Sequence, residues 1–195
     1  MTRGMGTSVG DRTRGTLIVL TLLLLVTGDV GVAQDRNLGI LGREAPEWDI
    51  DWWIDGDGEP TDIRLRDYRG KVVYLMCFQS WCPGCHSVGF PTLQALVKEY
   101  EDNDDVVFVA VQTVFEGFTT NSRDKVRDTQ KRYKLDIPMG HDPGSHSPQT
   151  WPNVMFNYRS GGTPWVVVID RKGVVRYNDF HIRPEQAVRL INGLL

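Results

Sequence analysis

Two cysteines and a histidine lie close together in the segment SWCPGCH, which runs from Ser80 to His86. Cys82 and Cys85 are separated by two residues, and the histidine follows the second cysteine directly. This spacing is compatible with three kinds of chemistry: a redox couple that exchanges a disulfide with a substrate, the attachment point of a c-type haem, or part of a metal site. The surrounding segments must decide between them.

The motif lies where a buried strand is expected to give way to a helix. Residues 71–78, KVVYLMCF, form an unbroken apolar run, which is typical of a central strand covered on both faces. In residues 91–101, PTLQALVKEYE, four apolar side chains recur at helical spacing: Leu93, Leu96, Val97 and Tyr100. We therefore expect the two cysteines at the N-terminus of that helix.

This position favours redox chemistry at the cysteines. A helix N-terminus presents unpaired N–H groups and the positive end of the helix dipole, and both stabilise a thiolate. We expect Cys82 to be the more exposed, attacking thiolate and Cys85 to be the resolving thiol, so that a disulfide between them forms when a substrate is reduced. Pro83 suits a first helical turn because its missing N–H costs little there, and Gly84 leaves room for a partner. The redox-active disulfide would serve without a bound cofactor or metal.

The remaining pattern predicts an α/β fold with a mixed central sheet flanked by helices. Residues 42–70 are rich in turn residues and aromatics, which indicates an irregular lead-in with short strands. The elements expected after the motif are a strand at 106–112, a polar, exposed helix at 122–134, a short strand at 137–142, a short helix at 154–158, a hairpin at 165–177 and an amphipathic helix at 184–195.

The first 33 residues are typical of an export signal. Three arginines precede an apolar core at residues 17–26, and small residues allow cleavage after Ala33. An uncleaved membrane anchor is the alternative, although the apolar run is short for a span. We expect residues 34–195 to form one periplasmic or extracellular domain without stable membrane insertion after cleavage. The net charge of -3 offers no basic face, so a nucleic-acid partner is not expected.

The cysteines are too close in sequence to serve as a disulfide scaffold. All 3 fall between Cys77 and Cys85, so they cannot connect distant segments, and chemistry is the better explanation. Cys77 lies inside the apolar strand, where a free cysteine usually behaves as a small apolar residue. We therefore interpret it as part of the core.

The strand ending in SWCPGC, the helix after it and GGTPW at the start of the later hairpin resemble the thioredoxin superfamily. The lead-in REAPEW and the segment IRLRDYRGKVVYLMCF are similar to TlpA-like, redoxin-type extracytoplasmic thiol–disulfide oxidoreductases. The resemblance covers residues 42–195 and implies a thioredoxin-like fold. The resemblance also implies roles for three residues. Pro164 would be a cis-proline lying against the CxxC, Thr163 would offer backbone groups to an extended substrate, and Trp81 would shield the nucleophile. Protein thiols or disulfides would be the substrates, with a further electron donor or acceptor upstream.

The chain departs from this family at the start of the helix. Pro91 lies one residue further from the second cysteine than is usual in the family, and Gly89 precedes it, so the first helical turns should be irregular. Cys77 stands where the family's strand usually carries an aromatic or apolar residue. The family often has an acidic residue beside the site, as a proton shuttle for the resolving thiol, and Glu116 is the candidate. An ordinary loop glutamate explains that residue equally well.

Two alternatives to disulfide exchange stay open. Peroxiredoxin-like thiol peroxidases share the APEW lead-in, but they carry Thr or Ser three residues before the reactive cysteine, where this chain has Gln79. CPGCH also satisfies the pattern of a c-type haem electron carrier, and methionines and histidines are available as a second axial ligand. A small helical haem protein, however, has no use for the preceding strand or for the proline before the hairpin.

A structural zinc needs four ligands in closed geometry, and the two cysteines with His86 are too clustered to supply them. We expect His86 to be exposed in the first helical turn, where a positive charge on it would help to hold the thiolate. His141, His146 and His181 fall in expected loops and should also be exposed.

Overall fold

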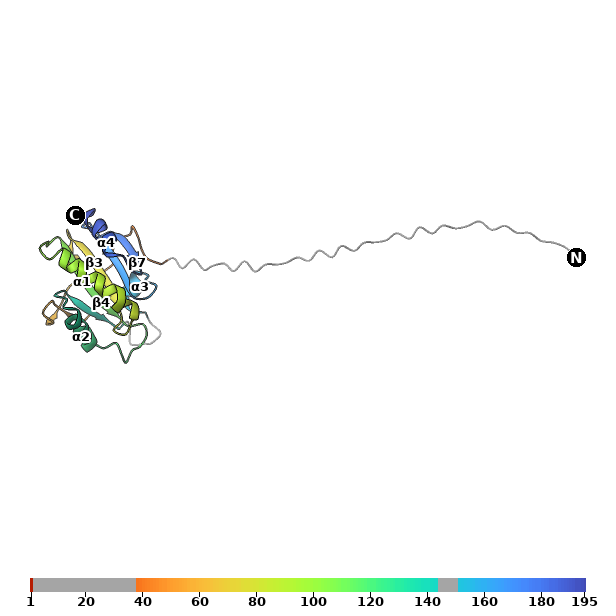
Figure 1. Cartoon of the computed structure of the whole chain (residues 1–195), viewed down its shortest axis with the longest axis horizontal. Helices are drawn as coiled ribbons and strands as arrows, with labels where there is room; N and C mark the ends of the chain where they lie inside the picture. Colours follow the sequence, from red (N-terminus) through yellow and green to blue (C-terminus); the bar gives the residue numbers. More distant parts are fainter. Residues whose placement is uncertain (2–37, 144–150) are drawn as a thin grey trace. The chain divides into compact units, whose positions relative to one another are not determined.

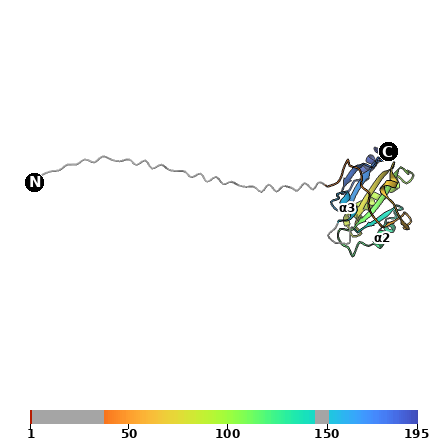
Figure 2. The ribbon, with the colours of Figure 1, turned by 180° about the vertical axis from the view of Figure 1, so that it is seen from behind.

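The computed structural model describes Met1 and residues 38–143 and 151–195, so the expected export signal and His146 lie outside the described residues. A mixed sheet of seven strands forms the centre of the described part of the chain (Figures 1 and 2). In spatial order the strands are β2-β1-β5-β4-β3-β6-β7. Their bounds are Trp53–Ile54 (β1), Pro60–Thr61 (β2), Val72–Phe78 (β3), Val106–Thr113 (β4), Met139–Asp142 (β5), Trp165–Ile169 (β6) and Val175–Asp179 (β7).

The directions of the strands make the sheet mixed, as the sequence predicts. β3 is parallel to β4, and β4 is parallel to β5. The hairpin of β6 and β7 adds antiparallel strands on one side, and β1 and β2 add them on the other. Parallel neighbours need helical crossovers, and antiparallel ones can follow a tight turn, which agrees with the order of elements in the chain.

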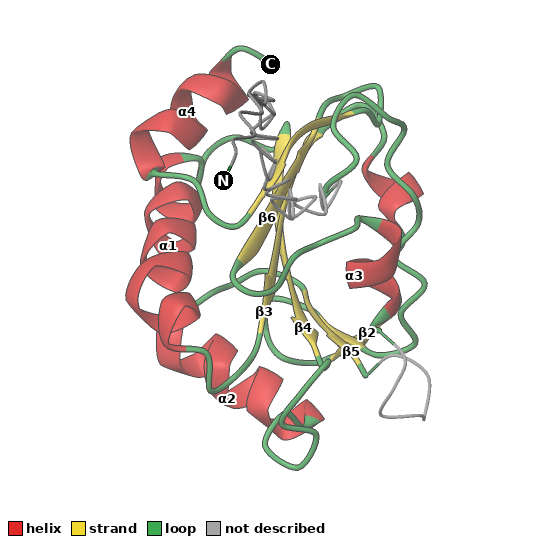
Figure 3. Cartoon of the chain, turned by 90° about the vertical axis from the view of Figure 1, so that its right-hand side faces the viewer, coloured by secondary structure: helices red, strands yellow, loops and turns green. Residues whose placement is uncertain are grey.

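Helices cover both faces of the sheet, and Figure 3 shows α1, α2 and α4 on one face and α3 on the other. Their bounds are Phe90–Glu99 (α1), Arg123–Tyr133 (α2), Asn153–Asn157 (α3) and Pro184–Asn192 (α4). Two further turns are a 3₁₀ turn at Leu65–Tyr68 (η1) and a π-helical turn at Cys85–Gly89 (η2). None of the helices in residues 38–143 and 151–195 has both the length and the apolar character needed to cross a bilayer.

The strand before the motif, β3, is buried along its whole length, as expected. Because side chains alternate across a strand, Tyr74, Met76 and Phe78 pack in the cluster that includes α1 and α4. Val73 and Cys77 pack in the cluster on the other face. Cys77 is fully covered there, which confirms its interpretation as a core residue.

The expectations about exposure were only partly met. Most residues of helix α2 are exposed, as expected, but Val126, Thr129 and Gln130 are buried. His141 was expected to be exposed in a loop, but it lies in β5, inside the strand predicted at 137–142, and only 7% of it is exposed. Burial, together with the charge of Arg123, lowers the pKa of His141 to about 4. His181 is exposed in a loop, as expected.

Candidate active site

Cys82 and Cys85 lie at the junction between β3 and the helical segment that continues into α1. The backbone is helical from Pro83 onward, and both cysteines are free thiols. Cys82 is 6% exposed and Cys85 is 0% exposed. The first cysteine is therefore the more exposed of the two, as expected, although only a small part of its surface is accessible.

The register of the sheet brings a distant segment against this pair. Cys77 in β3 pairs with Trp165 in β6, and these strands are antiparallel. The residues that follow β3 therefore lie level with those that precede β6. This places Thr163 and Pro164 beside the CxxC, and the peptide bond between them is cis, as the resemblance implied.

The Cys82 sulfur has two close partners. It accepts a hydrogen bond from the Cys85 N–H at 3.2 Å, and its thiol donates to the Thr163 carbonyl at 3.4 Å. Gly84 lies against the proline, since a Cβ atom at this glycine would stand 3.2 Å from Pro164 Cδ. The glycine thus lets the motif and the proline segment approach each other closely.

These contacts separate the acidities of the two thiols. The hydrogen bond from the Cys85 side chain lowers the pKa of Cys82 to about 6, against the effect of burial, and the Thr163 side chain and the Cys85 and Gly84 backbone N–H groups act in the same direction. Burial raises the pKa of Cys85 far above its ordinary value, and the neighbouring Cys82 sulfur raises it further. At neutral pH the first cysteine is therefore a thiolate and the second a thiol.

The start of the helix is irregular, as Pro91 and Gly89 predict. Proline has no N–H to donate to the carbonyl four residues earlier, and the Phe90 N–H bonds to the Cys85 carbonyl, five residues back. The resulting π-helical turn spans Cys85–Gly89. Gly89 faces the cis-proline, because a Cβ atom there would stand 3.1 Å from Pro164 Cβ.

Trp81 and Glu116 lie nearer the surface. Trp81 is 44% exposed, and its indole N–H donates to Gln79 Oε1 at 3.1 Å. Glu116 follows β4 in an exposed loop, where its backbone carbonyl accepts a hydrogen bond from the Asn121 side chain at 3.0 Å. The proton-shuttle role of Glu116 stays a prediction.

His86 is half-buried, so the expectation of an exposed histidine was wrong. Its Nε2 lies 2.7 Å from the Ser80 carbonyl, and its Nδ1 lies 2.7 Å from the Tyr133 hydroxyl. Because a carbonyl only accepts, Nε2 carries a proton. Both ring nitrogens are engaged, so neither is presented as an axial ligand, and this contact set does not support the haem alternative. Tyr133 is 47 residues away in sequence, so no local sequence pattern predicts the contact between His86 and Tyr133.

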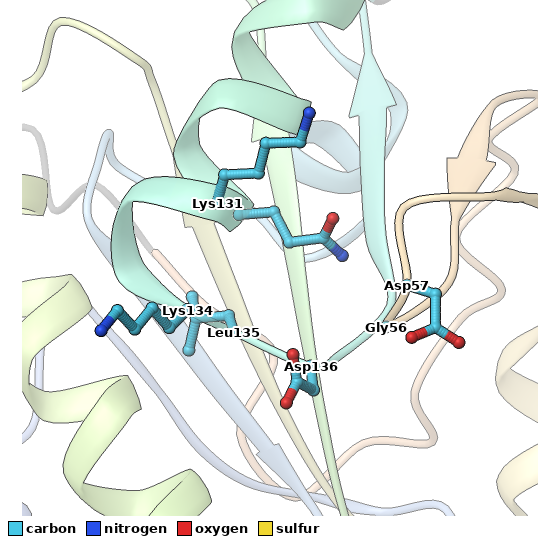
Figure 4. Close-up of a pocket in the computed structure, with 7 residues that line it drawn as sticks. Gly56, Asp57, Lys131, Lys134, Leu135 and Asp136 are labelled. Carbon is cyan, nitrogen blue, oxygen red and sulfur yellow. The ribbon is translucent and has the colours of Figure 1, made fainter.

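Residues 38–143 and 151–195 contain no group of three or more His, Cys, Asp or Glu side chains that could hold a metal ion. Figure 4 shows a pocket between the turn after β1 and the end of α2, with lysine and carboxylate side chains around it. No residue of the cysteine motif lines this pocket, which involves Gly56, Asp57, Gln130, Lys131, Lys134, Leu135 and Asp136.

Known structures share this fold. The crystal structure of a thioredoxin-like superfamily protein matches with a TM-score of 0.69 at 31% identity, over 77% of this chain and 95% of that chain. A thiol-disulfide isomerase from Corynebacterium glutamicum matches with a TM-score of 0.68 at 28% identity, over 77% and 96% of the two chains. Fold and paired cysteines together define a redoxin-type thiol–disulfide oxidoreductase of the thioredoxin superfamily.

Sequence relatives agree with this class. The thiol-disulfide oxidoreductase ResA of Bacillus cereus is 26% identical over 165 residues, which cover 82% of this chain and 84% of the relative. The thioredoxin-like protein YneN of Bacillus subtilis is 27% identical over 169 residues, covering 83% and 86%. Residues 41–178 match the AhpC/TSA family, and the chain belongs to that family.

Proposed function

We propose that the protein is an exported thiol–disulfide exchange enzyme in which Cys82 attacks and Cys85 resolves. The observation that carries this proposal is the environment of the Cys82 sulfur, which accepts the Cys85 N–H at 3.2 Å and has a pKa lowered to about 6. A thiolate present at neutral pH is the form that attacks disulfides. Export rests on the pattern of residues 1–33.

The exchange needs only the two thiols. The Cys82 thiolate attacks one sulfur of a substrate disulfide, that S–S bond breaks, and the other substrate sulfur leaves as a thiolate. Cys85 then attacks the Cys82 sulfur as its proton passes to the departing substrate sulfur, which releases the second substrate thiol and leaves the Cys82–Cys85 disulfide. Two electrons pass to the substrate, and the reverse sequence oxidises a dithiol. We propose no further cofactor.

Polypeptides with a thiol or disulfide are the proposed substrates. Large apolar side chains stand exposed near the motif. Trp81 directly precedes Cys82, Phe118 follows Gly117, which lies against the Trp81 ring, and Phe180 is exposed as well. The Phe180 ring packs against Gly161 and Gly162, in the segment that leads to the cis-proline. Exposed aromatic surface of this kind suits contact with another protein. A dithiol or disulfide partner upstream would reset the pair after each exchange.

The test is equilibration of the full chain with glutathione redox buffers, followed by measurement of the reduced fraction. We expect wild type to equilibrate through a Cys82–Cys85 disulfide and Cys82→Ser to lose this exchange. Cys77→Ala is the matched control and should keep it, because that thiol is covered in the core. Retained exchange in Cys82→Ser would overturn the proposal. Rapid consumption of hydrogen peroxide that needs Cys82 alone would instead favour the peroxidase alternative.

A further inference from the structure

One buried side chain outside the cysteine motif holds the turn that leads into Cys82. Asn121 lies in the loop between β4 and α2 and is 3% exposed. Its Oδ1 accepts hydrogen bonds from the Ser80 N–H at 2.8 Å and from the Ser80 hydroxyl at 2.9 Å. Its Nδ2 donates to Gln79 Oε1 at 2.8 Å and to the backbone carbonyls of Glu116 and Gly117 at 3.0 and 3.2 Å.

The partners of this carboxamide allow only one orientation. The Ser80 N–H can only donate, and the two backbone carbonyls can only accept, so Oδ1 and Nδ2 of Asn121 cannot exchange places. The orientation of Gln79 follows, because its Oε1 also accepts from the Trp81 indole N–H, which only donates. Asn121 therefore bonds two consecutive residues before the nucleophile, Gln79 and Ser80, and it reaches Trp81 through the Gln79 side chain.

The held turn ends at the reactive sulfur. The Cys82 N–H donates to the Gln79 carbonyl at 3.2 Å and closes the turn. On its other side the Ser80 carbonyl is held by His86 Nε2. The Cys82 sulfur accepts the Cys85 N–H at 3.2 Å, and this hydrogen bond favours the thiolate. Freedom in the turn would weaken it.

We propose that Asn121 is a positioning residue for the exchange site, whose carboxamide fixes the Gln79–Trp81 turn and thereby places the Cys82 sulfur against the Cys85 N–H. The side chain touches no reacting atom and acts through the backbone. The inference rests on the proposed function for its purpose, but the reactivity of the sulfur can be measured without any exchange substrate.

The test is the rate of alkylation of the reduced full chain by iodoacetamide as a function of pH, with stability measured separately by urea unfolding. In Asn121→Ala we expect the rate at pH 6 to fall about fivefold, as a rise of about one unit in the pKa of Cys82 requires, and the rate above pH 9 to stay unchanged. Gln130→Ala is the matched control, because Gln130 is a buried carboxamide on α2 that bonds two backbone carbonyls away from the thiols. It should lower stability and keep the pH profile.

If the role of Asn121 were purely structural, its substitution would lower the stability in urea and leave the pH profile of alkylation unchanged. Ser80→Ala deletes the hydroxyl contact and keeps the backbone N–H, so it should give a smaller shift in the same direction, about twofold at pH 6. An unchanged profile in either Asn121→Ala or Ser80→Ala, whichever folds, would overturn the proposal. If wild type fails to exchange disulfides and these profiles still shift, the proposed function fails and the positioning role of Asn121 stands.

Discussion

The hydrogen bond from the Cys85 thiol is the largest cause of the low pKa of Cys82, and substitution of Cys85 measures it. A hydrogen bond to a charged group contributes about 1.5–3 kcal/mol. At about 1.4 kcal/mol for each pKa unit, its loss should raise the pKa of Cys82 by about one to two units. Cys85→Ala removes the donor, and Cys85→Ser keeps a hydroxyl donor in nearly the same place. The backbone N–H at position 85 is present in both variants.

We therefore expect the thiolate of Cys82 to titrate near pH 6 in Cys85→Ser and about one to two units higher in Cys85→Ala. The assay is the pH dependence of alkylation by iodoacetamide under native conditions, where Cys77 does not react because it is fully covered. At pH 6 the alanine variant should react more slowly than the serine variant, and the two should converge at high pH. Equal titration midpoints would refute the assignment and would leave the backbone N–H groups as the source of the low pKa.

Three further outcomes follow from named contacts. Cys85→Ser should accumulate mixed disulfides with the natural partner, because the resolving thiol is gone, and mass spectrometry that finds none would count against the assigned nucleophile. Gly140→Ala should destabilise the fold by about 1–3 kcal/mol in urea unfolding, since the new Cβ would stand 2.8 Å from the buried Trp53 ring. Burial raises the pKa of Asp170, but hydrogen bonds from its own turn and from Arg176 outweigh this and lower it. Asp170→Asn should therefore lower the free energy of unfolding by about 1–3 kcal/mol at pH 7. The difference in this free energy between the variant and wild type should shrink as pH falls through that lowered pKa.

The sequence predicts the elements that position the site because their signals are local. The apolar run of β3 predicts a strand that is covered on both faces, and the helical spacing after it predicts a helix that is covered on one face. Both elements are buried in this way in the structure. The irregular helix start was predictable for the same reason, since Pro91 lacks an N–H wherever it lies. The contacts of Cys82 with Thr163 and of Gly84 with Pro164 depend on the register of β3 with β6, and only the resemblance to a family predicted them.

The polar residues around the motif could not be predicted in this way. His86 and Tyr133, and Asn121 and Ser80, meet only because α2 and the loop before it pack across the turn that precedes the motif. His141 was expected to be exposed although the sequence predicts a short strand at 137–142, and its burial comes from the pairing of that strand with β1 and β4. Polar side chains in a loop-like pattern look exposed until the partner segment is known.

The two thiols differ most in acidity before the reaction begins, and the reaction itself reduces this difference. Three causes raise the pKa of Cys85: burial, the hydrogen bond with the Cys82 sulfur, and the negative charge on that sulfur. When Cys82 forms a mixed disulfide its charge disappears, so the two causes that come from Cys82 weaken and burial remains. The Gln79 backbone and the Thr163 side chain still favour the Cys85 thiolate. The resolving thiol thus becomes easier to deprotonate only after the first attack, which sets the order of the two steps.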